Sequence, residues 1–315
     1  GQEYSMALAF AGLTPIWDKN NARILGFSIL SLAELGRPRI DITIRQSGLF
    51  RDIFPELNRL FFDAIDKLHQ RDETLQDNPY KNKIDRIFAP KPGSFGINIK
   101  EKIEEPLADH TAKIGEAWIN SSAWAYQKNG KFNQNTESLK KRLADTEALI
   151  HSHDLCESDL LSAKDYADHI GGFNAAVASM QKTNPKLYHL DISSDGIPKV
   201  RTTNQELARI IRGKLSDDKW VSGMLQHGYR GAAEITELVF NLSNFGKSGV
   251  YLPNHLIELV YNSTLANTKV ADFMAEENID ALKGLENTFS ELRNLGLWKS
   301  FHNSIRYEER LVDNG

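Results

Sequence analysis

Two hydrophobic periods predict strands near the beginning of the chain and helices over most of the remainder. The segments RILGFSIL (23–30) and RIDITIR (39–45) are short and rich in isoleucine. In the second, Ile40, Ile42 and Ile44 alternate with polar residues, which is typical of a half-buried strand. A small, mostly parallel or mixed sheet containing residues 39–45 is therefore expected near the N-terminus.

From Pro55 onward the apolar residues follow helical spacing, and proline suits the first turn of a helix. The predicted helices carry Leu57 to Leu68, Leu139 to Ile150, Leu207 to Ile211, Ile235 to Leu242, Leu256 to Val260 and Ile279 to Leu292. Asn278 and Gly296 are predicted to begin and end the last of these helices. Loops are predicted at 89–96 and 127–136, where proline, glycine and polar residues concentrate.

The predicted fold class is therefore mainly α, with a small α/β portion at the N-terminus and a helical body. Residues 1–54 are expected to be the end of an α/β domain and residues 55–315 a largely helical domain. The polar stretch 127–136 is a possible subdivision of the second domain.

Composition and charge exclude several classes of protein. The 315 residues carry 38 Lys and Arg against 42 Asp and Glu, a net charge of -4 that argues against a dedicated nucleic-acid binder. Mean hydropathy is -0.43, and no stretch approaches the ~20 apolar residues of a membrane span. With no basic segment typical of a signal peptide at the N-terminus, a cytoplasmic location is expected. Cys156 is the only cysteine, which excludes an intrachain disulfide and a thiolate zinc cluster.

Two familiar ligand motifs are incomplete. Gly246-Lys247-Ser248 resembles the end of a phosphate-binding loop, but Asn241 stands where the first glycine is required. We therefore expect no ATP binding by this chain. The segment from Asp191 to Gly196 resembles the start of a calcium loop, but its closing ligand would be a threonine, so a turn is expected there.

One segment, HSHDLCESD (151–159), concentrates side chains that carry chemistry. It holds two imidazoles, three carboxylates and a thiol, and it follows the predicted helix that ends near Ile150. Imidazole and carboxylate groups bind borderline divalent metals and accept protons near neutral pH. Spacing alone favours a solvated polar loop, because the segment contains no fixed metal-binding motif. We expect an extended or loop conformation, with Asp159 placed to cap the following helix.

A second candidate segment is RQSGLFRD (45–52), which directly follows a predicted strand. Functional loops often follow strands in α/β folds, and an arginine fork binds a carboxylate in two places. The simpler alternative is a structural pairing of Arg51 with Asp52.

Four ordered motifs together resemble a known family. LGRPRIDITIRQSGLFRD (35–52), KPGSFG (91–96), ESDLLSAKDYADHIGGF (157–173) and KWVSGMLQHGYRGAAE (219–234) resemble the C-terminal part of the cobaltochelatase large subunit. This is the CobN type of the family that is shared with the magnesium chelatase H subunit. The resemblance runs from about Ala7 to the end of the chain, and GGF (171–173) resembles the cobalt branch.

The resemblance implies insertion of a divalent metal, which is a substrate, into a tetrapyrrole. The metal would be cobalt(II) entering hydrogenobyrinic acid a,c-diamide during cobalamin biosynthesis, or magnesium entering protoporphyrin IX. ATP would be hydrolysed by AAA+ partner subunits and not bound here. Known large subunits are several times longer, so this chain is expected to act with the remainder of the large subunit and to be inactive alone.

With that support, we assign candidate roles to individual residues. The candidate catalytic residues are Glu157, Asp159 and Asp154, and the candidate metal ligands are His151, His153, Asp154 and Glu157. The candidate substrate-binding residues are Arg45, Ser47, Arg51 and Tyr166. Glu157 and His153 or Asp154 are expected to face a cavity shared with the RQSGLFRD loop.

Two other interpretations stay open. The chain would be a non-catalytic helical scaffold that docks the AAA+ subunits if its acidic and imidazole groups did not converge. It would be an unrelated metal hydrolase if His151, His153 and Asp154 surrounded an open metal site.

Overall fold

The computed structural model describes residues 1–21, 23–97, 106–154, 156–193, 197–302 and 305. The chain forms two compact units: unit 1 is Gly1–Asn98 with Ile119–Asp145, and unit 2 is Ile99–Trp118 with Thr146–Gly315. The domain boundary expected at residue 54 lies inside unit 1. Helices make up 53% of the residues that the structure describes, well above the roughly 30–35% of an average domain, so the protein is mainly α as predicted.

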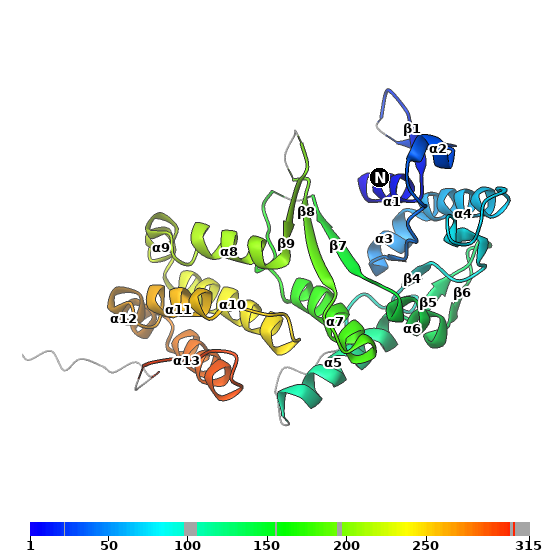
Figure 1. The fold of residues 1–315 in the computed structure, drawn as a ribbon. Coiled ribbons are helices and arrows are strands. Elements are labelled where there is room, and N and C mark those ends of the chain that lie inside the picture. The colour runs from blue at the N-terminus through cyan, green and yellow to red at the C-terminus, as the bar shows by residue number, and fades with distance from the viewer. Residues whose placement is uncertain (22, 98–105, 155, 194–196, 303–304, 306–315) are drawn as a thin grey trace, which may run out of the picture. The chain divides into compact units, whose positions relative to one another are not determined.

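Unit 1 combines short helices with two small sheets (Figure 1). Its helices are Gln2–Phe10 (α1), Leu32–Leu35 (α2), Gly48–Ile53 (α3), Pro55–His69 (α4), the 3-10 turn Pro79–Lys81 (η1) and Thr136–Ala144 (α6). Its strands are Leu13–Trp17 (β1), Ile24–Ile29 (β2), Ile44–Arg45 (β3), Ile87–Ala89 (β4), Trp124–Tyr126 (β5) and Phe132–Gln134 (β6). Strands β1 and β2 form an antiparallel hairpin, and β3-β4-β5-β6 form a mixed sheet in which only β3 and β4 are parallel.

The predicted strand over 39–45 is wrong for most of its length, because only Ile44–Arg45 pairs with a neighbour. Ile42 and Ile44 pack against the core of unit 1, but Ile40 is 42% exposed, whereas the polar Arg39 is 3% exposed. The Arg39 guanidinium donates to both Glu73 carboxylate oxygens at 2.7 Å and to three backbone carbonyls. Tertiary ion pairing therefore overrides the strand pattern.

Two arginines from other parts of unit 1, Arg86 and Arg142, also bind to this segment. Asp41 accepts from Arg86 at 3.0 Å and from Arg142 at 2.5 Å, and the Arg142 Nε donates to the Thr43 hydroxyl at 2.6 Å. Burial alone would raise the pKa of Asp41, but these two guanidinium groups hold it below its usual value. The polar residues of the segment RPRIDIT (37–43) thus form hydrogen bonds and ion pairs that link separate parts of unit 1.

Unit 2 packs a three-stranded sheet against a helical body (Figure 1). Its strands are Ala148–His153 (β7), Lys186–Asp191 (β8) and Lys199–Thr202 (β9). Its helices are the first turns of Leu107–Ser122 (α5), then Lys164–Gln181 (α7), Thr203–Gly213 (α8), Asp218–Met224 (α9), Gly228–Lys247 (α10), Asn254–Ser263 (α11), Thr268–Glu277 (α12) and Ile279–Asn294 (α13). Strand β7 is parallel to β8, and β9 is antiparallel to β8.

The sequence predicts the helical body of unit 2 well. The Asn278 side chain accepts from Ala281 N and begins α13, and Gly296 follows the end of that helix at a φ of 71°. Helix α10 lies in the core between α7 and α13. Lys247, the lysine of the incomplete phosphate motif, is buried in α10 and pairs with Glu291 at 2.5 Å.

The secondary structure predicted from the sequence is wrong between α6 and β7. The predicted helix reaching Ile150 is wrong, since α6 ends at Ala144 and Ala148–His153 is a strand. Strands are thus not confined to the N-terminal part of the chain. The predicted polar loop 127–136 is partly a hairpin, because it includes β6.

Two adjacent glycines let α7 pack closely within unit 2. A Cβ on Gly171 would lie 1.9 Å from the Ser248 hydroxyl, and a Cβ on Gly172 would lie 2.5 Å from Trp118 Cδ1. Both distances are far below the roughly 3.5–4.0 Å of an ordinary carbon contact. The GGF sequence therefore has a packing role in this helix.

Within the ranges that the structure describes, no helix is both long and apolar enough to cross a bilayer. Residues 194–196, where the sequence predicts a turn, lie outside those ranges.

Candidate functional site

The candidate site lies at the carboxyl ends of the two parallel strands of unit 2. His151 and His153 are two residues apart on β7, so their side chains share one face of the sheet. His151 stands opposite His189 of β8, and His153 stands opposite Asp191. The extended conformation predicted for the beginning of the HSHDLCESD segment is confirmed. Three imidazoles therefore gather where α/β sheets commonly hold their functional groups.

The three rings and Tyr166 of α7 form one contact cluster, which we call the histidine cluster. The rings of His151 and His189 stack with centroids 5.7 Å apart and planes 19° from parallel. His189 also lies 5.8 Å from the His153 ring. The Tyr166 ring meets both β7 histidines edge-on, at 5.5 Å from His151 and 5.7 Å from His153.

Hydrogen bonds fix the tautomer of His153. Its Nε2 lies 2.9 Å from the Ser158 carbonyl oxygen. Because a carbonyl only accepts, Nε2 carries the proton and donates it. The other ring nitrogen, Nδ1, lies 3.4 Å from the Tyr166 hydroxyl.

A buried carboxylate lies behind the cluster. The Glu206 side chain on α8 is 2% exposed and lies 3.9 Å from His189 Nε2. Arg201 donates to the Glu206 carboxylate at 3.1 Å. Arg209 donates to the same carboxylate at 3.1 Å from Nε and at 2.5 Å from Nη2. Arg201 also reaches Asp191 at 3.5 Å. Two guanidinium groups therefore supply the hydrogen bonds that this buried carboxylate needs.

Burial keeps the central imidazoles uncharged. It lowers the pKa of His151 to about 3, with smaller contributions from His189 and His153. It also lowers the pKa of His189, against the opposing effect of Glu206. Neutral imidazoles keep a lone pair for a metal ion or a proton. Among the residues described, no three His, Cys, Asp or Glu side chains already converge on one ion position.

The acidic residues of the same segment fall into two groups. Asp154 and Glu157 are exposed, just beyond the end of β7. Asp159 is buried: its Oδ1 accepts from Leu161 N at 2.9 Å, and its Oδ2 pairs with Lys214 at 2.7 Å. The prediction that Asp159 caps the next helix is wrong, because α7 begins after Ala163 without a side-chain cap. Asp159 instead stabilises the turn before it.

The candidate substrate-binding arginines lie in unit 1. Arg45 is at the end of β3, where its Nε donates to the Ser122 hydroxyl at 3.2 Å and burial lowers its pKa to about 10. Arg51 is buried on α3 and forms two hydrogen bonds to Asp52, at 2.6 and 2.8 Å. It also donates to the carbonyls of Pro90 and Lys91, at 2.8 and 3.1 Å.

Those contacts give part of the RQSGLFRD segment a structural role. Arg51 fastens the predicted loop 89–96, which the structure confirms, to α3. The exposed Ser47 is the N-cap of α3 and accepts from Phe50 N at 3.1 Å. A role for Arg45, Ser47 or Arg51 in substrate binding stays a prediction, as does a cavity shared with Glu157.

Sequence reasoning missed His189 and Glu206. The segment KLYHLD (186–191) alternates Leu187 and His189 with residues of the other face, and that period could have identified a strand with an inward histidine. Glu206 stands three residues after Thr203, and this spacing suggests that Glu206 only caps the helix. In the structure the capping box is instead formed by Thr202 and Gln205.

Comparison with known proteins gives the family. The CobN/Magnesium Chelatase family model matches residues 1–305, so the chain belongs to this family. The chain is 32% identical to the aerobic cobaltochelatase subunit CobN of Pseudomonas aeruginosa over 95% of its own length. It is 24% identical to the magnesium-chelatase H subunit of Chlorobaculum parvum over 97% of its length.

A solved structure shows the same fold. The catalytic subunit of cobaltochelatase from Mycobacterium tuberculosis matches 96% of this chain with a TM-score of 0.87 and 26% identity. The chain spans only about a quarter of these relatives: 26% of the Pseudomonas protein, 25% of the Chlorobaculum protein and 27% of the Mycobacterium structure.

Proposed function

We propose that this chain is the C-terminal region of the large, tetrapyrrole-binding subunit of an ATP-dependent cobaltochelatase. The reaction would insert cobalt(II) into hydrogenobyrinic acid a,c-diamide during cobalamin biosynthesis, and the ion is a substrate, not a resident cofactor. The observation that carries the proposal is the histidine cluster, which lies at a strand edge within the region that the family model covers.

The chemistry requires a metal ion to be delivered and two pyrrolic protons to be removed. We assign delivery to His151 and His153 with the exposed carboxylates of Asp154 and Glu157, because imidazoles and carboxylates bind borderline divalent ions. Glu157 and Asp154 are the proposed proton acceptors, since both are exposed beyond the strand edge. Asp159 is the weakest candidate, because the turn and Lys214 already occupy its oxygens.

The macrocycle needs groups that hold its periphery. Tyr166 is the proposed contact in unit 2, because its half-buried ring lies against both β7 histidines. Arg45, Ser47 and Arg51 are the proposed contacts from unit 1, with Ser47 the most exposed of them. AAA+ partner subunits would bind and hydrolyse ATP, and the complex would act in the cytoplasm with the remainder of the large subunit.

A magnesium chelatase is the second candidate. The similarity to magnesium-chelatase H subunits favours it, and protoporphyrin IX would then be the macrocycle. Cobalt is preferred because identity to the CobN proteins is 32% and 31%, against 24% for the Chlorobaculum protein.

The test places Glu157→Gln and Asp159→Asn separately in a full large subunit and measures metal insertion with the ATPase partners present. Glu157→Gln is expected to lower the rate by about 100-fold, the range of general acid–base catalysis. Lys219→Gln, an exposed site on α9, serves as the control and is expected to insert metal at the parent rate. If both acidic variants fold and insert metal at the parent rate, the catalytic assignment is wrong.

A further inference from the structure

The two ring nitrogens of His153 have different surroundings. Nε2 lies 2.9 Å from the Ser158 carbonyl oxygen and 3.3 Å from the Ser158 hydroxyl. A histidine that binds a metal ion usually donates from its other ring nitrogen to an oxygen of this kind, which fixes the orientation of the ring. Ser158 therefore leaves Nδ1 as the atom through which His153 would bind an ion.

That atom faces the hydroxyl of Tyr166. The phenol oxygen lies 3.4 Å from Nδ1, within the range of a long hydrogen bond. A ring nitrogen without a proton only accepts, so the hydroxyl is the donor in this contact. The lone pair that His153 would offer to a metal ion is thus directed at Tyr166.

The ring of Tyr166 is held in this position from two sides. It meets His151 at 5.5 Å and 87° and His153 at 5.7 Å and 68°, the edge-to-face arrangement that aromatic pairs favour. Tyr166 is also the third residue of α7, where its backbone N–H donates to the Ala163 carbonyl at 3.3 Å. Because backbone and ring are both fixed, the hydroxyl stays beside Nδ1.

A hydroxyl that keeps its proton competes with a metal ion at this atom. Borderline divalent ions prefer imidazole and carboxylate ligands, so the ion gains little from the phenol and must displace its hydrogen bond. The net free energy of one such hydrogen bond is small, and the competition therefore weakens binding without preventing it. Weakened binding suits an ion that is a substrate, since an ion that is delivered must also be released.

We propose that the Tyr166 hydroxyl regulates metal binding by the histidine cluster, by occupying Nδ1 of His153 until an ion displaces it. Tyr166 is in this respect a positioning residue that acts through His153. The inference rests on the proposed function, because it takes the cluster as the place where the ion is held before insertion.

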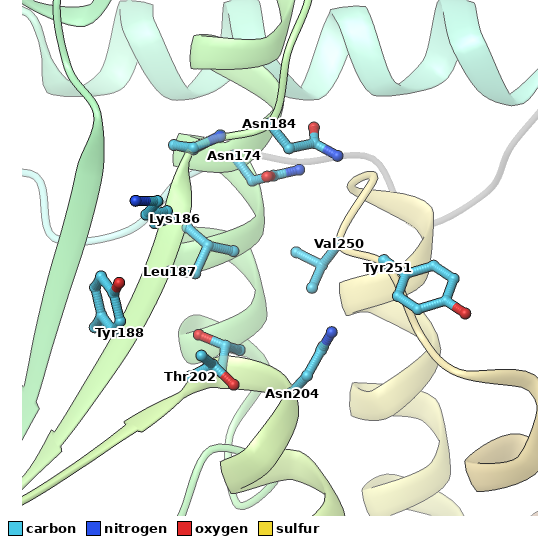
Figure 2. A pocket seen from close by; sticks show the side chains of 11 residues that line it. Asn174, Asn184, Lys186, Leu187, Tyr188, Thr202, Asn204, Val250 and Tyr251 are labelled. Atoms are coloured by element: carbon cyan, nitrogen blue, oxygen red, sulfur yellow. The ribbon is translucent and has the colours of Figure 1, made fainter.

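The test measures the affinity of the full large subunit for cobalt(II) chloride, with no tetrapyrrole or ATP present. Calorimetry gives the affinity, and the visible absorption bands of bound cobalt(II) report its ligands. Tyr166→Phe removes only the hydroxyl and keeps the ring against both histidines. Tyr251→Phe is the matched control, because Tyr251 is 70% exposed and borders a separate pocket whose described lining residues include no member of the histidine cluster (Figure 2).

We expect Tyr166→Phe to bind cobalt(II) about threefold to tenfold more tightly than the parent, the range of one hydrogen bond, and Tyr251→Phe to bind it like the parent. In a His153→Gln background, Tyr166→Phe is expected to change neither the affinity nor the absorption bands. A merely structural role of the hydroxyl would not give this dependence on His153.

Equal affinity of Tyr166→Phe and the parent overturns the inference, and so does weaker binding, which would make the hydroxyl a ligand. Either result leaves the proposed function intact as long as His153→Gln alone weakens cobalt(II) binding. Cobalt(II) binding that is absent, or that neither His151→Gln nor His153→Gln changes, overturns the inference together with the metal-delivery role in the proposed function.

Discussion

Replacing Gly172 by alanine tests the packing role of the GGF sequence in α7. The new Cβ would lie 2.5 Å from Trp118 Cδ1, 3.0 Å from Cγ and 3.1 Å from the Trp118 Cβ. The indole has little room to move, since Trp118 is 3% exposed and its ring meets Phe173 edge-on at 5.7 Å. Overpacking of this kind costs typically 1–3 kcal/mol, and an overlap of about 1 Å with a buried ring belongs at the upper end.

Alanine also returns about 1 kcal/mol of helix propensity, so the expected net loss is about 2 kcal/mol in the free energy of unfolding. The assay is urea unfolding of the chain, followed by far-ultraviolet circular dichroism. Gly223→Ala on α9 is the matched control, because nothing lies within 4 Å of its new Cβ. That control is expected to gain about 0.5 kcal/mol. A Gly172→Ala protein as stable as the parent would show that α7 does not need this close approach.

Three further predictions concern buried polar groups. Arg39→Leu is expected to cost about 3–5 kcal/mol in urea unfolding, because it leaves the buried Glu73 carboxylate with only the longer contact to the exposed Arg71 at 3.5 Å, and a loss smaller than about 1 kcal/mol would contradict that role. His151 has a folded pKa of about 3 against about 6.5 when unfolded, so its contribution to stability is full above pH 6.5 and is lost as the pH falls toward 3. His151→Asn should therefore lose less stability than the parent between pH 7 and pH 5, and parallel curves would refute the assignment. Glu206→Gln is expected to cost about 2–4 kcal/mol by removing the buried charge that Arg201 and Arg209 share, which leaves Arg201 with Asp191 alone, whereas the exposed Glu237→Gln should cost nothing measurable.

Local signals made much of the helical body predictable. Pro55 begins α4, Asn278 caps α13, and the apolar spacing that follows each residue needs no information from distant parts of the chain. The errors over residues 39–45 and 148–153 have a different cause. The residues before Ile44 are held by ion pairs to distant partners such as Glu73, and Ala148–His153 becomes a strand because β8 lies beside it.

The site could be predicted only in part for the same reason. His151 and His153 are found from the sequence because they lie in one short segment that concentrates imidazole and carboxylate groups. His189 and Glu206 join them only through the register of β7 with β8 and the packing of α8. Neither the strand register nor the packing of α8 can be inferred from the spacing of residues along the chain. The structural roles of Asp159 and Arg51 likewise depend on Lys214 and on the carbonyls of Pro90 and Lys91.

The most direct test of the central claim is the rate of cobalt(II) insertion by a full large subunit that carries His151→Gln and His153→Gln together. The rate is followed by the absorbance change of the metallated tetrapyrrole, with the ATPase subunits and ATP present. If the histidine cluster delivers the metal, the double variant should bind the metal-free tetrapyrrole like the parent but insert cobalt at least about 100-fold more slowly. A folded double variant that inserts cobalt at the parent rate would contradict this role of the cluster.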